Sequence, residues 1–256
     1  IKRRFAVEVA WLEALCAESG IPEAPALSEE ETAFLDSLVD NFTEADAARV
    51  KEIEATTNHD VKAVEYAIKE KLKGTSLEAR SEFVHFSCTS EDINNLSHAL
   101  MLRDGTKLLR EAQEAFVDEL AAFAEGCVEV PMLARTHGQP ASPTRLGKEF
   151  KVFVERLERQ LDLLQDVEPM AKFGGATGGF NAHHVAYPEI DWVEFGNKFV
   201  ESLGLVRAQY TTQIEHYDNL AATFDALKRI NTILTDLARD MWTYISMEYF
   251  RQQVKK

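Results

Sequence analysis

The sequence of 256 residues has few cysteines and no long hydrophobic run. Its three cysteines, Cys16, Cys88 and Cys127, are widely spaced and include no Cys-x-x-Cys pair. This usage argues against a disulfide framework and against a zinc site, and it indicates reduced thiols in a cytoplasmic protein. Because no stretch of about 18 consecutive apolar residues occurs, we expect no transmembrane helix.

Basic residues are also scarce relative to acidic ones. The chain has 28 Lys and Arg against 43 Asp and Glu, which gives a formal net charge of −15. This balance argues against nucleic acid or a membrane as a partner, because both reward clustered basic side chains. The same charge repels a small anion at long range, so an anion site in this protein must depend on local donors.

Helical periodicity dominates what the sequence does contain. Apolar residues recur at helical spacing, and no alternating run is long enough for a real sheet, although a short two-stranded element fits near residues 128–134. Capped helix starts are predicted at Ser28 and Thr43. The predicted helices that matter for the argument cover residues 60–72, 92–124, 143–167, 192–203 and 216–249.

The length of these helices and a composition shift near residues 74–81 define the expected organisation. Sustained apolar spacing over long helices is typical of bundles. We therefore expect an all-α protein with a small N-terminal helical domain over residues 1–80 and a long-helix bundle over residues 81–256.

Three polar segments stand beside predicted helix starts: residues 56–60 (TTNHD), 89–92 (TSED) and 135–140 (RTHGQP). Helix starts present unpaired N–H groups and partial positive charge, which suit anionic ligands. Long helices could bring the three segments together as one site. Each segment also has a structural explanation, because the first two fit helix caps and a loop histidine is by itself only a titratable group.

A glycine-rich run, residues 174–179 (GGATGG), lies in the irregular stretch 172–210. It lacks the setting and the Lys-Ser/Thr ending of a phosphate-binding P-loop, so we interpret it as a turn whose backbone can approach another surface closely. The adjacent His183 and His184 have diverging side chains, and no His, Cys or carboxylate set has metal spacing. We expect neither a metal nor a cofactor.

Taken in order, four segments resemble the adenylosuccinate lyases of the fumarase/aspartase superfamily: residues 56–66, 83–95, 135–141 and 210–215. The resemblance spans essentially the whole chain, and argininosuccinate lyases and class II fumarases differ at residues 88–92. It implies an all-α fold of the fumarase/aspartase type and a homotetramer with shared active sites. The implied reaction is β-elimination of fumarate from adenylosuccinate, giving AMP, and from the succinyl-carboxamide intermediate of purine biosynthesis.

The resemblance also implies roles for single residues. The general acid maps onto His137. An unperturbed imidazole, with a pKa of about 6.5, suits proton delivery near neutral pH. His85 corresponds to a histidine that binds phosphate or carboxylate. The substrate contacts as a set map onto Asn58, His59, Asp60, His85, Thr89, Ser90 and Gln213.

One departure concerns the catalytic base. The family's signature loop, Ser-Ser-x-Met-Pro-x-Lys-x-Asn-Pro, carries the basic serine and does not occur here, and neither do the C-terminal helical domain and an N-terminal Arg-Tyr contact. We therefore expect a fragment of a longer enzyme that is inactive alone. Two alternatives stay open: another superfamily lyase with a different amine leaving group, and a catalytically silent helical interaction module.

Overall fold

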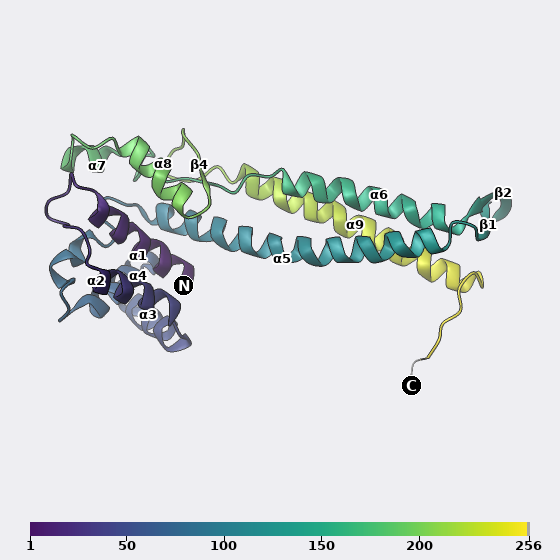
Figure 1. The fold of residues 1–256 in the computed structure, drawn as a ribbon, viewed down its shortest axis with the longest axis horizontal. Helices are drawn as coiled ribbons and strands as arrows, with labels where there is room; N and C mark the ends of the chain where they lie inside the picture. The colour runs from purple at the N-terminus through teal and green to yellow at the C-terminus, as the bar shows by residue number, and fades with distance from the viewer. Residues whose placement is uncertain (255–256) are drawn as a thin grey trace. The chain divides into compact units, whose positions relative to one another are not determined.

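The fold is helical along most of the chain (Figure 1), and a computed structural model describes residues 1–254. The predicted all-α class is confirmed, with short strands as minor additions. In chain order the elements are α1 (Lys2–Ala17), α2 (Glu29–Asp40), α3 (Glu44–Thr57), α4 (Asp60–Leu72), the 3₁₀ helix η1 (Glu78–Phe83), α5 (Ser90–Gly126), β1 (Pro131–Thr136), β2 (Gln139–Arg145), α6 (Leu146–Gln165), β3 (Met170–Ala171), α7 (Asn181–Ala186), α8 (Trp192–Ser202), β4 (Val206–Arg207) and α9 (Asp218–Ser246).

The strands differ most from the prediction. β1 and β2 form an antiparallel hairpin in which Pro131 pairs with Arg145 and Thr136 with Gln139. The hairpin therefore lies further along the chain than residues 128–134, and α6 begins at Leu146 instead of at Pro143. Pro143 pairs with Leu133 inside the hairpin. The predicted helix start was wrong because a proline that opens a helix and one in a short strand look alike in sequence.

The chain divides into two compact units. Unit 1 comprises Ile1–Asp104 and Pro169–His216, and unit 2 comprises Gly105–Glu168 and the remainder from Tyr217. The predicted domain boundary between residues 80 and 81 falls inside η1, within unit 1. That boundary therefore stays a prediction.

The core of unit 1 is built around α1. Its Trp11 is completely buried and packs edge-on against Phe173 and Phe199, with ring centroids 4.8 and 5.0 Å away. The indole N–H donates to the carbonyl of Phe86 at 3.1 Å. Trp11 thus joins α1 to α8 and to the two loops that precede α5 and α7, which carry most of the candidate site.

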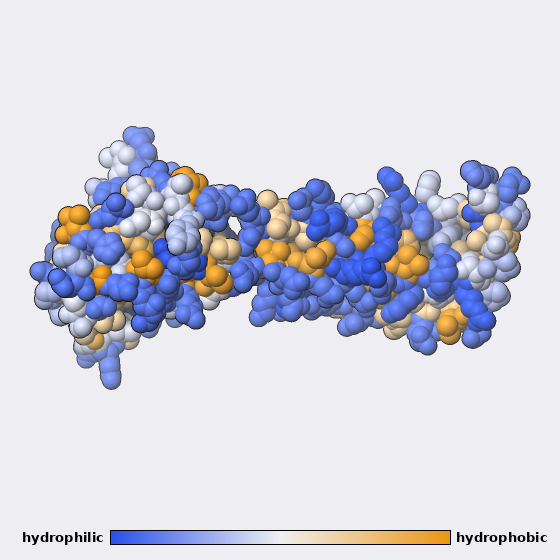
Figure 2. Space-filling view, turned by 90° about the horizontal axis from the view of Figure 1, so that it is seen from above, coloured by the Kyte–Doolittle hydropathy of each residue, from blue (hydrophilic) through white to orange (hydrophobic). Residues whose placement is uncertain are grey.

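Unit 2 is a helical bundle of α6, α9 and the part of α5 from Gly105 onward, with the β1–β2 hairpin. Phe150 of α6 packs edge-on against Phe123 of α5 at 4.9 Å. Several large apolar side chains stay at the surface, including Trp242 and Leu108, which are 75% and 69% exposed. Figure 2 shows hydrophobic residues at intervals along this bundle. Among the described helices, none is both long and apolar enough to cross a membrane.

Candidate active site

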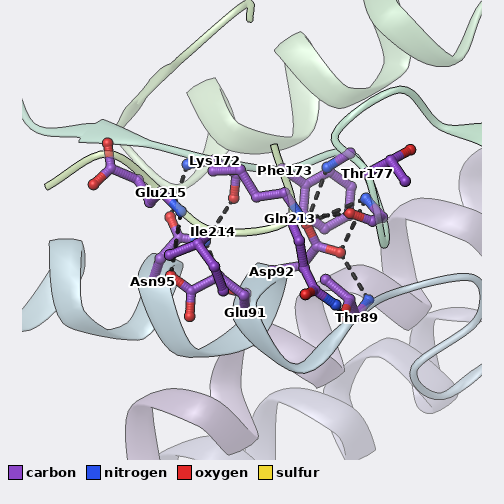
Figure 3. Close-up of polar contacts among 12 residues, drawn as sticks. Thr89, Glu91, Asp92, Asn95, Lys172, Phe173, Thr177, Gln213, Ile214 and Glu215 are labelled. Carbon is purple, nitrogen blue, oxygen red and sulfur yellow. Dashed lines mark hydrogen bonds and ion pairs between the residues drawn. The ribbon is translucent and has the colours of Figure 1, made fainter. Parts of the chain in front are cut away.

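The carboxylate of Asp92, in the first turn of α5, is completely buried and collects hydrogen bonds from three directions (Figure 3). Its Oδ1 accepts from Nζ of Lys172 at 2.6 Å and from the N–H of Gly174 at 3.0 Å. Its Oδ2 accepts from the N–H groups of Thr89 at 2.8 Å and Gly175 at 3.1 Å. One side chain therefore joins the start of α5 to the glycine-rich loop.

The predicted capping box at residues 89–92 is half present. Asp92 accepts from the Thr89 N–H, as a box requires, but the Asp92 N–H donates to the Thr89 carbonyl at 3.0 Å. The Thr89 hydroxyl instead accepts from Nε2 of Gln213 at 3.4 Å. The hydroxyl thus faces the segment before α9, which places two of the predicted substrate contacts side by side.

Lys172 and Asn95 hold the glycine-rich loop in place through hydrogen bonds. Lys172 and Asp92 are both completely buried, and Nζ of Lys172 also donates to the carbonyl of Gly175 at 2.6 Å. The Asn95 side chain pairs with the backbone N–H and carbonyl of Lys172, each at 2.7 Å, much as a neighbouring strand would. A buried charge needs such complete pairing to be tolerated.

The glycine-rich loop does approach other segments closely, as the sequence predicted. Gly175 and Gly178 have φ angles of 77° and 78°, a region that favours glycine. A Cβ added to Gly178 would lie 2.6 Å from the Thr211 carbonyl oxygen, and one on Gly175 would lie 3.3 Å from that of Ser87. The loop therefore packs between the segments that carry Thr89 and Gln213.

The histidine of the first polar segment is itself a helix cap. Nδ1 of His59 accepts from the N–H of Lys62 at 3.1 Å, so this nitrogen carries no proton. With Nδ1 accepting, a ring proton lies on Nε2, which is 3.1 Å from Oγ of Ser90. His59 and Ser90, 31 residues apart, are thus brought together at a half-exposed position.

The neighbours of His59 have mainly conformational contacts in this chain. Asn58 ends α3 in the left-handed region, with a φ of 51°, and its N–H donates to the carbonyl of Glu54. Asp60 forms an ion pair with Arg4 at 2.9 Å. These contacts hold the turn that presents the His59 ring, while direct substrate contacts by Asn58 and Asp60 stay predictions.

His85 lies in a strained turn and pairs with a buried carboxylate. Its φ is 63°, and its Nδ1 lies 2.6 Å from Oε1 of Glu8. Burial lowers the pKa of the imidazole, but the hydrogen bond to Glu8 and its negative charge outweigh burial, so the net shift is upward. Burial raises the pKa of the Glu8 carboxyl, and the His85 contact opposes part of that rise. Both pKa values are raised, so the pair keeps its protons to higher pH than the two groups would separately.

His137 lies in unit 2, at the tip of the β1–β2 hairpin. With Gly138 it forms a two-residue turn with φ angles of 52° and 73°, the signature of a type I′ hairpin turn. The turn exposes the imidazole. The other predicted site residues all lie in unit 1, and the convergence of His137 with them stays a prediction.

Sequence reasoning missed the residues that organise the site. Asp92 stood in a capping motif and, with Asn95, in the matching segment 83–95, but neither was given a role. Lys172 and Glu8 were not singled out at all, because each acts through a partner about 80 residues away. His183 is completely buried among aromatic rings, and burial lowers its pKa to about 4, so it is neutral. Within residues 1–254, no group of three or more His, Cys, Asp or Glu side chains could hold a metal.

Comparisons with known proteins show which family the chain belongs to. A family model described as lyase matches residues 2–255. The protein named adenylosuccinate lyase from Haemophilus influenzae is 52% identical over 255 residues, which are 99% of this chain and 56% of that protein. The same name applies to relatives from Escherichia coli K12, 49% identical with the same coverage, and from Dictyostelium discoideum, 50% identical over 265 residues. The chain spans little more than half the length of these curated relatives.

Solved structures support the fold at lower sequence identity. A fumarate lyase from Mesorhizobium sp. BNC1 superposes with a TM-score of 0.78 over 96% of this chain and 55% of that one, at 22% identity. A 3-carboxy-cis,cis-muconate lactonizing enzyme from Pseudomonas putida gives 0.75 over 95% and 54%, at 21% identity. With the family model matching almost every residue, the chain belongs to the lyase family.

Proposed function

We propose that this chain is the part of an adenylosuccinate lyase that carries the general acid and a large share of the nucleotide contacts. The reaction eliminates fumarate from adenylosuccinate to give AMP, and from the succinyl-carboxamide intermediate of purine biosynthesis. The observation that carries the proposal is the cluster of His59, Ser90, Thr89 and Gln213, drawn from three distant segments in a chain about half identical to proteins of that name.

The chemistry assigns different tasks to the two units. Elimination needs a base for the C–H proton next to a carboxylate, donors for the enolate-like dianion, and an acid for the departing nitrogen. The donors for the dianion are the hydroxyls of Thr89 and Ser90 and the amide of Gln213. His137, exposed on its hairpin, is the acid. The base belongs to the family's signature loop, which this sequence does not contain.

The assembly we propose is a homotetramer in the cytoplasm with active sites shared between subunits. An exposed imidazole on a hairpin tip can reach a site of another subunit, and the exposed apolar side chains of unit 2 are suited to burial against other helices. The partners are then an anionic nucleotide and further copies of the same chain.

The test is a substrate screen with the full-length enzyme. Adenylosuccinate, the succinyl-carboxamide ribonucleotide and several other succinyl-amines are supplied in turn, and fumarate release is measured. We expect the two purine substrates to be cleaved, and the His137→Ala variant to be at least about a hundredfold slower because proton delivery is lost. Cleavage of a different succinyl-amine alone would indicate another lyase, and no cleavage together with no AMP binding would indicate a non-catalytic module.

A further inference from the structure

Glu8 of α1 is a carboxylate buried completely, and it faces a histidine from a distant part of the chain. Its Oε1 lies 2.6 Å from Nδ1 of His85, 77 residues later. A carboxylate withdrawn from water is costly unless it is paired. A helix that buries Glu8 therefore holds the His85 ring against it, and the ring loses its freedom to rotate.

The contact decides which edge of the ring can meet a ligand. Because Nδ1 faces Glu8, Nε2 lies on the opposite edge of the imidazole ring. The His85 side chain keeps 17% of its surface exposed. When the pair carries both of its protons, Nε2 bears one of them, whether the shared proton rests on Nδ1 or on Oε1. Nε2–H is then a fixed donor, suited to an anionic oxygen.

Other charged groups near His85 come from α4. Lys62 and Glu65 both act on the imidazole, with opposite signs. The Glu65 carboxylate is itself paired with Lys62 at 2.8 Å and with Lys69 at 3.1 Å, so its charge is balanced locally. Glu8 is in direct contact with the ring, and its negative charge favours the protonated imidazole.

We infer that Glu8 is a positioning residue: it orients the His85 ring and keeps it protonated, so that Nε2–H binds a phosphate or carboxylate oxygen of the substrate. This inference rests on the proposed function, because it takes the ligand to be a nucleotide that carries a succinyl group.

The test measures protons taken up on binding, and needs no turnover. Calorimetry with the full-length enzyme uses AMP and, separately, fumarate, in buffers of different ionisation enthalpy. A range of about pH 7.5 to 8.5 keeps the AMP phosphate dianionic, since its second pKa is about 6. The wild type should take up few protons because His85 is already charged. In Glu8→Gln the ring is neutral beforehand, so binding should take up close to one proton and weaken about tenfold.

Glu13→Gln is the matched control. Glu13 lies on the same helix and has a half-buried carboxyl, but it does not pair with a histidine. This variant should match the wild type in proton uptake and in affinity. A thermal melt of each variant establishes that it is folded. If Glu8→Gln does not fold, the wild type alone decides: its affinity must stay constant across the calorimetry range, where His85 is charged, and must fall at higher pH, where the imidazole loses its proton.

The outcomes separate the two proposals. If Glu8→Gln takes up a proton only when AMP binds, the group that contacts His85 is the phosphate. If it takes up a proton only when fumarate binds, that group is a carboxylate. Both results support the role of Glu8. Equal uptake and affinity in the wild type and Glu8→Gln, or a pH-independent wild-type affinity in the fallback, overturns that role alone. A wild type that binds neither AMP nor fumarate overturns the proposed function, and the role of Glu8 with it.

Discussion

At the scale of single residues, the buried pair of Lys172 and Asp92 is both a stabilising contact and a constraint on the site. Lys172 donates to Asp92 and to Gly175, and the same carboxylate accepts the Thr89 N–H. Each group is tolerated inside the protein because the others complete its hydrogen bonds. A change at Lys172 therefore reaches the Thr89 hydroxyl through the Asp92 carboxylate.

We expect Lys172→Met to destabilise the folded chain by about 3–5 kcal/mol, because it leaves the Asp92 carboxylate buried without its cation. The measurement is urea unfolding followed by the fluorescence of the buried Trp11 and Trp192. Lys198→Met is the control, since the Lys198–Glu194 pair is largely exposed and its loss should cost no more than roughly 0.5 kcal/mol. Equal shifts in the two variants would contradict the role given to Lys172.

Glu13 supplies a prediction about pH. Burial, and secondarily the charge of Asp36, raises the pKa of this carboxyl to about 7. In the unfolded chain the pKa returns to its ordinary value near 4.5, so between these values the folded state binds more protons. This contribution to stability is therefore present in acid and is lost as the pH rises toward 7.

Glu13→Gln should remove that loss. Relative to the wild type, the variant should be more stable at about pH 8, by roughly 1 kcal/mol after allowance for the partial exposure of Glu13, and little changed near pH 5. Urea unfolding at the two pH values measures both differences. A variant equally destabilised at the two pH values would show that Glu13 acts by packing and not by charge.

At the scale of elements, local signals in the sequence were reliable and long-range ones were absent. The capped helix starts at Ser28 and Thr43 formed as predicted, and α4 covers the predicted residues 60–72, because caps and periodicity act within a few residues. The box at Thr89 formed only in part, because the side-chain amide of Gln213 competes with the Asp92 N–H for the Thr89 hydroxyl. Such competition leaves no trace in a local pattern.

The candidate site shows the same difference between local signals and long-range contacts. Thr89, Gln213, His59 and Ser90 were found through resemblance, and the structure places them in contact in pairs. The buried residues that organise the site lie far from their partners in the sequence: Glu8 is 77 residues from His85, and Lys172 is 80 residues from Asp92. Composition and spacing do not encode such pairs, since any buried acid looks like a surface acid until the fold is known.

The glycine-rich loop supplies a prediction at the element scale. Gly178→Ala would strain a φ of 78° and push a Cβ to 2.6 Å from the Thr211 carbonyl oxygen, displacing the segment that carries Gln213. Gly74→Ala has the same strain at a φ of 76° but meets nothing within 4 Å. We expect Gly74→Ala to cost about 1 kcal/mol, and Gly178→Ala to cost at least ~2 kcal/mol more.

Calorimetry and unfolding on the full-length enzyme separate the two effects. Gly178→Ala should also weaken AMP binding, because the loop and residues 211–213 shift together, whereas Gly74→Ala should bind normally. Normal binding by a folded Gly178→Ala variant would show that the close approach serves stability alone.

At the scale of the whole molecule, the proposed function requires that His137 of one chain meets a unit 1 site, of the same chain or of another. His59 and Ser90 are in contact within one chain, whereas His137 stands on a hairpin of unit 2. If subunits share sites, one chain supplies the first two residues and another supplies the acid. Two inactive variants could then complement each other in a mixed tetramer.

We expect full-length His59→Ala and His137→Ala, inactive separately, to regain activity when unfolded together in equal amounts and refolded as mixed tetramers. Each site draws its His59 segment and its hairpin independently, so about a quarter of the sites should be intact. Mixing His59→Ala with Ser90→Ala is the control, because those two residues come from the same chain and no intact pair can form. Fumarate release from adenylosuccinate measures both mixtures, and differently tagged subunits establish that the tetramers are mixed. No recovery in the first mixture would mean that each chain supplies its own acid, and the hairpin would then have to reach the Thr89 cluster of its own chain.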